Sequence, residues 1–311
     1  MKIGMNLLLW TAHLTEKQYP LLEQLKKTGF EGVEVPMFEG DLSHYERVGQ
    51  RLKDLGLGAT AVTVMTPEEN PVSTDSAQRS RAFDRIRDRI DWTAAIGGDV
   101  LCGPLHSPLG QFTGTGPTAD EKKRLIEFHQ RACEHARPAN VSIGLEILNR
   151  FETYCVSTVD VGIEIVDAVN APNFGLHLDP FHQNIEEKDI PQTIVRAGDR
   201  LLHYHISEND RGVPGTGHID WEGVFKALKR IKYDGWLTIE SFGQLLPDLA
   251  AATRVWRPLF PSEETVYKQG FKFIQKMWGP QKRAAAGKSS ARKVARKTTK
   301  KSSKRTAGAR R

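Results

Sequence analysis

The sequence has few cysteines, and they lie far apart. Its 311 residues include three, Cys102, Cys133 and Cys155, and no C-x-x-C pair occurs. An odd number of widely spaced thiols argues against a disulfide framework and against a cysteine zinc site. It favours a compartment in which thiols stay reduced. We therefore expect a cytoplasmic protein.

Long apolar runs are also missing. No stretch of eighteen apolar residues occurs, so we expect no membrane-spanning helix. The first ten residues contain one Lys, and no small-residue cleavage site follows them, which favours a strand over a signal peptide. Apolar residues make up 39% of the chain and charged residues 26%, which is typical of a globular protein and excludes a fibrous or fully disordered one.

Acidic residues are absent from the end of the chain. Residues 282–311 hold 13 of the 44 Lys and Arg and no Asp or Glu, so residues 1–281 hold 31 basic side chains against 38 acidic ones. Because Val294 is the one larger apolar residue of this segment, we predict a disordered basic tail. Its charge suits nucleic acid or another polyanion. A solvated tail without a specific partner is an equal alternative.

Residues 1–281 alternate between β-rich runs and amphipathic stretches. The predicted strands are 2–8, 32–36, 58–64, 99–103, 142–148, 174–179, 201–206 and 236–241. The predicted helices are 16–28, 44–55, 76–96, 119–136, 159–169, 190–197, 221–231 and 263–277. Eight such units predict a single α/β domain, a (β/α)8 TIM barrel. The competing doubly wound sheet needs a glycine-rich turn after the first strand, and residues 8–13 contain no glycine.

Four polar residues end the last four predicted strands. Glu146, Asp179, His205 and Glu240 each lie inside or directly after an apolar run. The carboxyl ends of barrel strands meet at one mouth, where barrel enzymes carry their chemistry. Three carboxylates held together repel one another unless a cation lies between them. Oxygen ligands with one imidazole favour Mn²⁺, Co²⁺ or Mg²⁺. In the alternative interpretation, each residue pairs separately with an Arg or a backbone amide.

At these residues the chain resembles the ketose 3-epimerases, which include D-tagatose, D-allulose (D-psicose) and L-ribulose 3-epimerases of the xylose isomerase-like barrels. The matching stretches are 145–152 (LEILNRFE), 178–187 (LDPFHQNIEE), 205–211 (HISENDR) and 239–242 (IESF). The resemblance implies one Mn²⁺ or Co²⁺ held by Glu146, Asp179, His205 and Glu240. It also implies substrate contacts by Glu152, His182 and Arg211, a free sugar as substrate, and a homodimer or homotetramer.

Two carboxylates on opposite faces of a sugar can invert a carbon next to a carbonyl. One removes the C3 proton, the resulting cis-enediolate is stabilised by the cation, and the other carboxyl returns a proton from the far side. Glu146 and Glu240 are the expected pair. The aromatic residues that hold the sugar's far end in well-studied members are missing near residues 6–8 and 105–110. This keeps open an isomerase or dehydratase of the same superfamily, of the hydroxypyruvate isomerase, inosose dehydratase or 3-keto-sugar isomerase type.

The basic tail suggests two further functional classes. An endonuclease IV-like enzyme needs extra histidines, including one near the end of the third strand, where residues 62–66 contain none. A nucleic-acid-binding module without catalytic activity is the other alternative.

Overall fold

Eight parallel strands close into a barrel. The structure is a computed structural model, and it describes residues 1–279. Strand order follows chain order, with β8 hydrogen-bonded back to β1. The strands are β1 (Lys2–Asn6), β2 (Gly32–Pro36), β3 (Gly58–Val62), β4 (Gly98–Gly103), β5 (Ser142–Glu146), β6 (Phe174–Leu178), β7 (Leu201–Ile206) and β8 (Trp236–Ile239). The predicted TIM barrel is therefore confirmed. The predicted tail, residues 282–311, lies outside the described residues.

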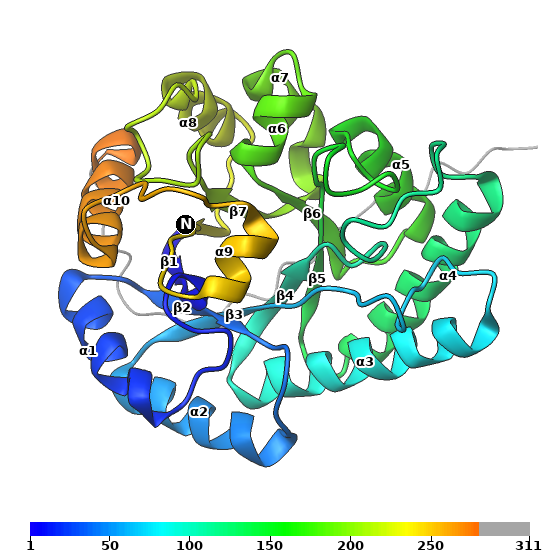
Figure 1. The fold of residues 1–311 in the computed structure, drawn as a ribbon, viewed down its shortest axis with the longest axis horizontal. Coiled ribbons are helices and arrows are strands. Elements are labelled where there is room, and N and C mark those ends of the chain that lie inside the picture. The colour runs from blue at the N-terminus through cyan, green and yellow to red at the C-terminus, as the bar shows by residue number, and fades with distance from the viewer. Residues whose placement is uncertain (280–311) are drawn as a thin grey trace, which may run out of the picture. The chain divides into compact units, whose positions relative to one another are not determined.

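Helices form a ring around the barrel (Figure 1). They are α1 (Tyr19–Thr28), α2 (Leu42–Leu55), α3 (Ser76–Ala95), α4 (Ala119–Ala136), α5 (Val159–Val169), α6 (Pro180–Glu186), α7 (Ile190–Ala197), α8 (Trp221–Arg230), α9 (Pro247–Thr253) and α10 (Glu263–Trp278). Along residues 1–279, no helix combines the length and apolar character that crossing a membrane requires.

Two helices and several strand ends differ from the sequence prediction. Helices α6 and α9 were not predicted. Helix α6 begins where the Asp179 side chain accepts a hydrogen bond of 2.7 Å from the amide of Phe181 and Pro180 takes the first helical position. The strands predicted over 2–8, 58–64, 142–148, 174–179 and 236–241 all end one or two residues earlier. The chain leaves the sheet at these points to form the barrel mouth.

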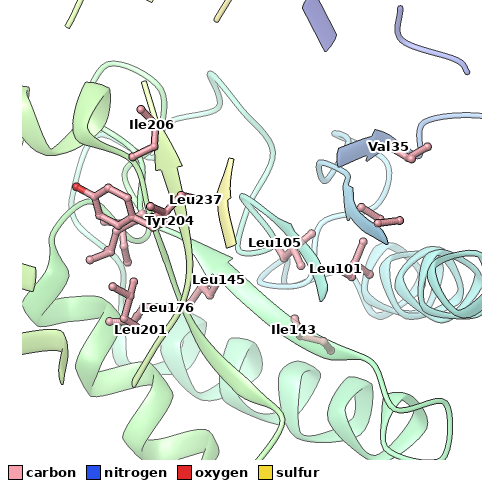
Figure 2. Close-up of a cluster of buried hydrophobic side chains, with 14 of the residues drawn as sticks. Val35, Leu101, Leu105, Ile143, Leu145, Leu176, Leu201, Tyr204, Ile206 and Leu237 are labelled. Carbon is pink, nitrogen blue, oxygen red and sulfur yellow. The ribbon is translucent and has the colours of Figure 1, made fainter. Parts of the chain in front are cut away.

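Alternate residues of each strand serve different purposes, as the two-residue period of a strand requires. On β5, Ile143 and Leu145 belong to the main apolar cluster, which also contains buried side chains of the surrounding helices. Figure 2 shows part of this cluster on β4 to β8. The intervening residues, such as Gly144 and Glu146, face the lumen. The apolar side chains between strands and helices stabilise the barrel, and the lumen is free to carry polar groups.

Trp236 fills one end of the lumen. It is the first residue of β8, and its indole Nε1 donates to Asp99 Oδ1 over 2.9 Å. A Cβ atom at Gly32 would lie 2.4 Å from the Trp236 ring, and one at Gly58 would lie 3.1 Å from it. These strands therefore begin with glycine because the indole needs the space. The polar residues of the lumen lie toward the other end.

A buried histidine in α4 makes the fold sensitive to acid. The side chain of His129 is fully buried, and its ring centroid lies 4.5 Å from that of Phe174. Burial, and then the charge of His106, lower the pKa of His129 from 6.5 to about 3. The unfolded chain therefore binds a proton that the folded chain does not bind. The His129 contribution to stability is present above about pH 6.5 and is lost as the pH falls toward 3.

Replacement of His129 by Gln is expected to make the protein less sensitive to acid. Wild-type protein loses about 2.5 kcal/mol through this residue between pH 7 and pH 4.5, and the variant does not. Urea unfolding at the two pH values measures the difference. The partly exposed His135 on the same helix offers His135→Gln as the control. An equal loss of stability in wild type and His129→Gln would contradict the assignment.

Candidate active site

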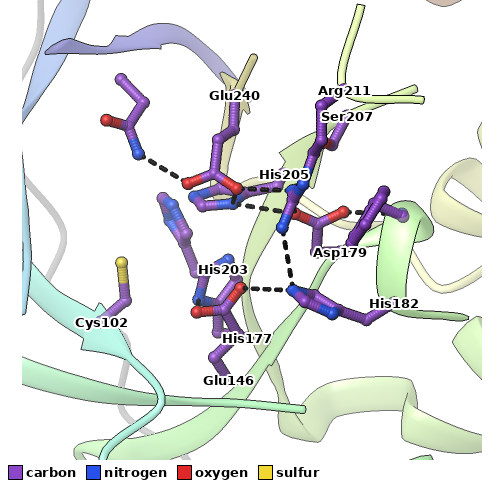
Figure 3. Close-up of polar contacts among 12 residues, drawn as sticks. Cys102, Glu146, His177, Asp179, His182, His203, His205, Ser207, Arg211 and Glu240 are labelled. Carbon is purple, nitrogen blue, oxygen red and sulfur yellow. Dashed lines mark hydrogen bonds and ion pairs between the residues drawn. The ribbon is translucent and has the colours of Figure 1, made fainter. Parts of the chain in front are cut away.

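Four strand-end residues converge at the mouth of the barrel. Glu146 ends β5, Asp179 follows β6, His205 lies in β7 and Glu240 follows β8. One potential ligand atom from each lies within 4.8 Å of the other three, and all four side chains are buried. Figure 3 shows them with their polar contacts. The structure thus brings together the four residues that the sequence predicted to converge, and their roles remain predictions.

Arg211 bridges two of these carboxylates. Its Nη1 atom lies 2.7 Å from Asp179 Oδ2 and 2.7 Å from Glu240 Oε2. The guanidinium carbon lies 3.8 Å from the ring centroid of Phe181 and 4.9 Å from that of Phe242. The backbone of Arg211 is left-handed, with a φ of +65°, and its carbonyl accepts a hydrogen bond of 3.2 Å from the amide of Phe242. The loop after β7 therefore holds Arg211 over the cluster at the cost of local strain.

The charges of the cluster are strongly coupled. Burial opposes the negative charge of Asp179, but the Arg211 guanidinium and the neighbouring histidines together outweigh it and hold the Asp179 pKa well below its usual range. Burial opposes the positive charge of His205, but the carboxylates of Glu240, Glu34 and Asp179 together outweigh it and raise the His205 pKa. Burial, and then the Glu240 carboxylate, raise the pKa of Glu146 well above its ordinary value. Glu146 therefore binds a proton more readily than an exposed glutamate does.

The donor set fits a divalent cation. Three buried carboxylates and one imidazole surround a common point, and such oxygen-rich sets suit Mn²⁺, Co²⁺ or Mg²⁺. Glu240 adds to burial in raising the pKa of Glu146, because carboxylates held close together repel one another. A cation there would offset this repulsion.

The three predicted substrate-contacting residues lie beside the cluster. His182 Nε2 is 3.7 Å from Glu146 Oε1 and 3.1 Å from Arg211 Nη2. Burial, and then the charge of Arg211, lower the pKa of His182 to about 3, so the imidazole is neutral at neutral pH. Glu152 Oε1 lies 3.9 Å from His182 Nδ1 and accepts a hydrogen bond of 2.8 Å from Asn149 Nδ2. All seven residues singled out in the sequence therefore gather in one place.

Comparison with known proteins assigns the chain to a family. The profile of the xylose isomerase-like TIM barrels matches residues 22–277. An L-ribulose 3-epimerase from Methylomonas sp. (strain DH-1) is 32% identical over 81% of this chain and 88% of its own length. A ketose 3-epimerase from Arthrobacter globiformis is 30% identical over 88% of this chain and 96% of its own length. The chain is a member of the ketose 3-epimerase family. The predicted resemblance is thereby confirmed.

A solved structure supports the same assignment. The crystal structure of D-allulose 3-epimerase from Methylomonas sp. in complex with D-allulose superposes with a TM-score of 0.84 at 30% identity, and the match covers 89% of this chain and 97% of that one. The named relatives are carbohydrate epimerases. This member of the ketose 3-epimerase family is accordingly an isomerase.

One buried carboxylate of this epimerase was missed by the sequence analysis. Glu34 in β2 accepts hydrogen bonds of 2.9 Å from His205 Nε2 and Asn6 Nδ2 through Oε1, and one of 2.9 Å from Thr60 through Oε2. The second Nδ2 hydrogen of Asn6 reaches Glu240 Oε1, also over 2.9 Å. Glu34 thus orients His205 from behind, and Asn6 links it to Glu240. The sequence contains a signal that could have identified Glu34, because this residue interrupts an apolar strand just as Glu146 does.

Proposed function

We infer that this epimerase interconverts the C3 epimers of free ketoses of the D-tagatose, D-allulose/D-fructose or L-ribulose type. One observation carries the proposal. The carboxylates of Glu146 and Glu240 point toward each other from opposite sides of the cluster, with Asp179 and His205 between them (Figure 3). A ketose placed between the two carboxylates would present one face of C3 to each.

The two glutamates would exchange roles between the forward and reverse reactions. An ionised carboxylate takes the C3 proton from one face, and the electron pair left behind forms a cis-enediolate with the C2 carbonyl. The other glutamate, protonated beforehand, gives its proton to C3 from the opposite face and re-forms the ketone. The raised pKa of Glu146, due to burial and to Glu240, suits it to carry the proton for one direction.

The remaining residues would bind and orient the sugar. Glu146, Asp179, His205 and Glu240 would hold the Mn²⁺ or Co²⁺, with Mg²⁺ as the alternative. A divalent cation there supplies Lewis-acid stabilisation of the negative charge on the C2 and C3 oxygens. Arg211 would donate to the C1–C3 oxygens, and neutral His182 with Glu152 would hydrogen-bond the C1–C2 end. The homodimer or homotetramer, the cytoplasmic location and the polyanion partner of residues 282–311 remain predictions.

Hydrogen exchange at the sugar tests the proposal. Incubation of the Mn²⁺-loaded or Co²⁺-loaded enzyme with D-fructose, D-tagatose and L-ribulose in deuterated water is expected to place one deuterium at C3, because the removed proton is replaced from solvent-exchanged carboxyl groups. Proton NMR follows the C3 signal and the appearance of the epimer. Exchange at C1 with formation of an aldose would instead indicate an isomerase of the hydroxypyruvate isomerase type. Loss of water would indicate a dehydratase.

A further inference from the structure

A second set of potential metal ligands lies in the lumen. Cys102 on β4, His177 on β6 and His203 on β7 each present an atom within 4.8 Å of the others and of His205, and all are buried. His177 and His203 precede Asp179 and His205 by two residues. They therefore face the lumen one layer below the four-residue cluster. Figure 3 shows the three side chains beneath Glu240 and beside Glu146.

The two histidines are poorly partnered. Both side chains are fully inaccessible to solvent, and within residues 1–279 neither ring nitrogen of His177, nor Nδ1 of His203, makes a hydrogen bond. The Nε2 atom of His203 has Glu34 Oε2 as its partner, 2.8 Å away. The two rings contact each other with centroids 4.8 Å apart. Buried polar groups in native proteins are almost always partnered. Three unpartnered nitrogens in one place therefore indicate a missing ligand.

A glycine in β5 lets the potential ligands pack closely together at this level. Gly144 of β5 lies between the strands that carry Cys102 and His177. A Cβ atom at Gly144 would lie 3.3 Å from Cys102 Cβ, 3.4 Å from His177 Cβ and 3.7 Å from His203 Cβ. The three potential ligands thus surround a residue that has no side chain.

A carboxylate completes the set and balances its charge. Glu34 Oε2 lies 2.8 Å from His203 Nε2 and 3.2 Å from Cys102 Sγ. Ligand atoms of a tetrahedral zinc-type ion lie roughly 3.5 Å apart, so small movements would place these atoms on one ion. One thiolate and one carboxylate would offset a charge of +2. A thiolate with two imidazoles suits Zn²⁺ or Co²⁺ better than Mg²⁺.

We propose that Cys102, His177, His203 and Glu34 bind a second divalent cation of the zinc type, one layer below the four-residue cluster. This ion ties β2, β4, β6 and β7 together beneath the catalytic groups. It takes no part in the proposed epimerisation, so either proposal can fail alone. The sequence suggested no cysteine zinc site because the ligands come one at a time from four strands and have no linear spacing.

Cobalt loading of the full chain tests the site. The protein is stripped with a chelator, reloaded with Co²⁺ and dialysed, and its metal content is measured by mass spectrometry. We expect two cobalt ions per chain and the near-ultraviolet charge-transfer band of a cobalt–thiolate bond. Cys102→Ser is expected to lose the band and one ion, and Cys133→Ser, at a buried thiol in α4, to keep both. Asp179→Asn is expected to lose an ion and keep the band.

The wild-type protein decides the question even if a variant does not fold. Absence of the thiolate band from cobalt-loaded protein, or a band that survives in folded Cys102→Ser, would overturn the proposal. One cobalt ion per chain with the band would instead support this site and count against the four-residue cluster. Anomalous diffraction from cobalt-loaded wild-type crystals gives an independent answer. A peak between Cys102 Sγ and the rings of His177 and His203 supports the site, and a water molecule or empty density there overturns it.

Discussion

Replacement of either Glu146 or Glu240 by Gln is expected to lower ketose turnover by about 10³-fold, within the range that a positioned acid or base contributes. An amide has nearly the shape of a carboxylate but cannot accept the C3 proton or carry a proton to be delivered. Both glutamates are buried, and glutamine has nearly the same volume as glutamate, so each variant should retain the wild-type circular dichroism spectrum. Initial rates under saturating Mn²⁺ measure the loss.

The two variants should also differ from each other. With one carboxylate left, the enzyme can still remove the C3 proton from one face and return it to the same face. Glu146→Gln is therefore expected to exchange deuterium into one C3 epimer without inversion, and Glu240→Gln into the other. The matched control is Glu186→Gln, which is expected to keep turnover near wild type. Glu186 lies away from the cluster and forms an ion pair of 2.9 Å with Arg150. A wild-type rate in either glutamate variant would refute the two-carboxylate mechanism.

Removal of divalent cations is expected to reduce turnover more than 100-fold, because Lewis-acid stabilisation of a developing enediolate is worth several kcal/mol. Mn²⁺ or Co²⁺ added back should restore it. The melting temperature should rise on loading, because the ion binds the folded chain and not the unfolded one. Rate measurements and thermal unfolding of chelator-treated and reloaded protein, with the metal content checked by mass spectrometry, test both effects.

A variant separates loss of the cation from other effects of the chelator. Asp179→Asn replaces a charged carboxylate ligand with a neutral amide of nearly the same shape. The variant should therefore need far more Mn²⁺ than wild type for half-maximal turnover. A chelator-treated protein that contains no metal and still epimerises ketoses at the full rate would show that the cluster at the mouth works without a cation.

The sequence was sufficient to predict the barrel and the convergence of four strands. Each strand–helix unit shows its own hydrophobic period, and the closed order of the strands follows from right-handed crossovers. Convergence at the mouth needed no further information, because parallel strands in a barrel all end at the same face. Glu146 and Glu240 are separated by 94 positions in the chain and yet meet for this reason.

Loop contacts could not be predicted in the same way. Arg150 and Glu152 are two residues apart in the sequence, yet Arg150 forms its ion pair with Glu186 at the end of α6, while Glu152 turns toward His182. That choice depends on where α6 ends, and α6 was itself missed. Asp179 followed by Pro180 was a sufficient signal for a helix start.

The alternation of side chains along the strands separates the residues that stabilise the fold from those that face the lumen. On β7, Tyr204 and Ile206 pack against the helices, whereas His203 and His205 face inward. Evolution can therefore change what the enzyme does by altering every second position, while the intervening positions keep the protein folded. The same arrangement makes the register of each strand critical, since a shift by one residue would bury the polar side chains of the lumen against the helices and turn the packing side chains into the lumen.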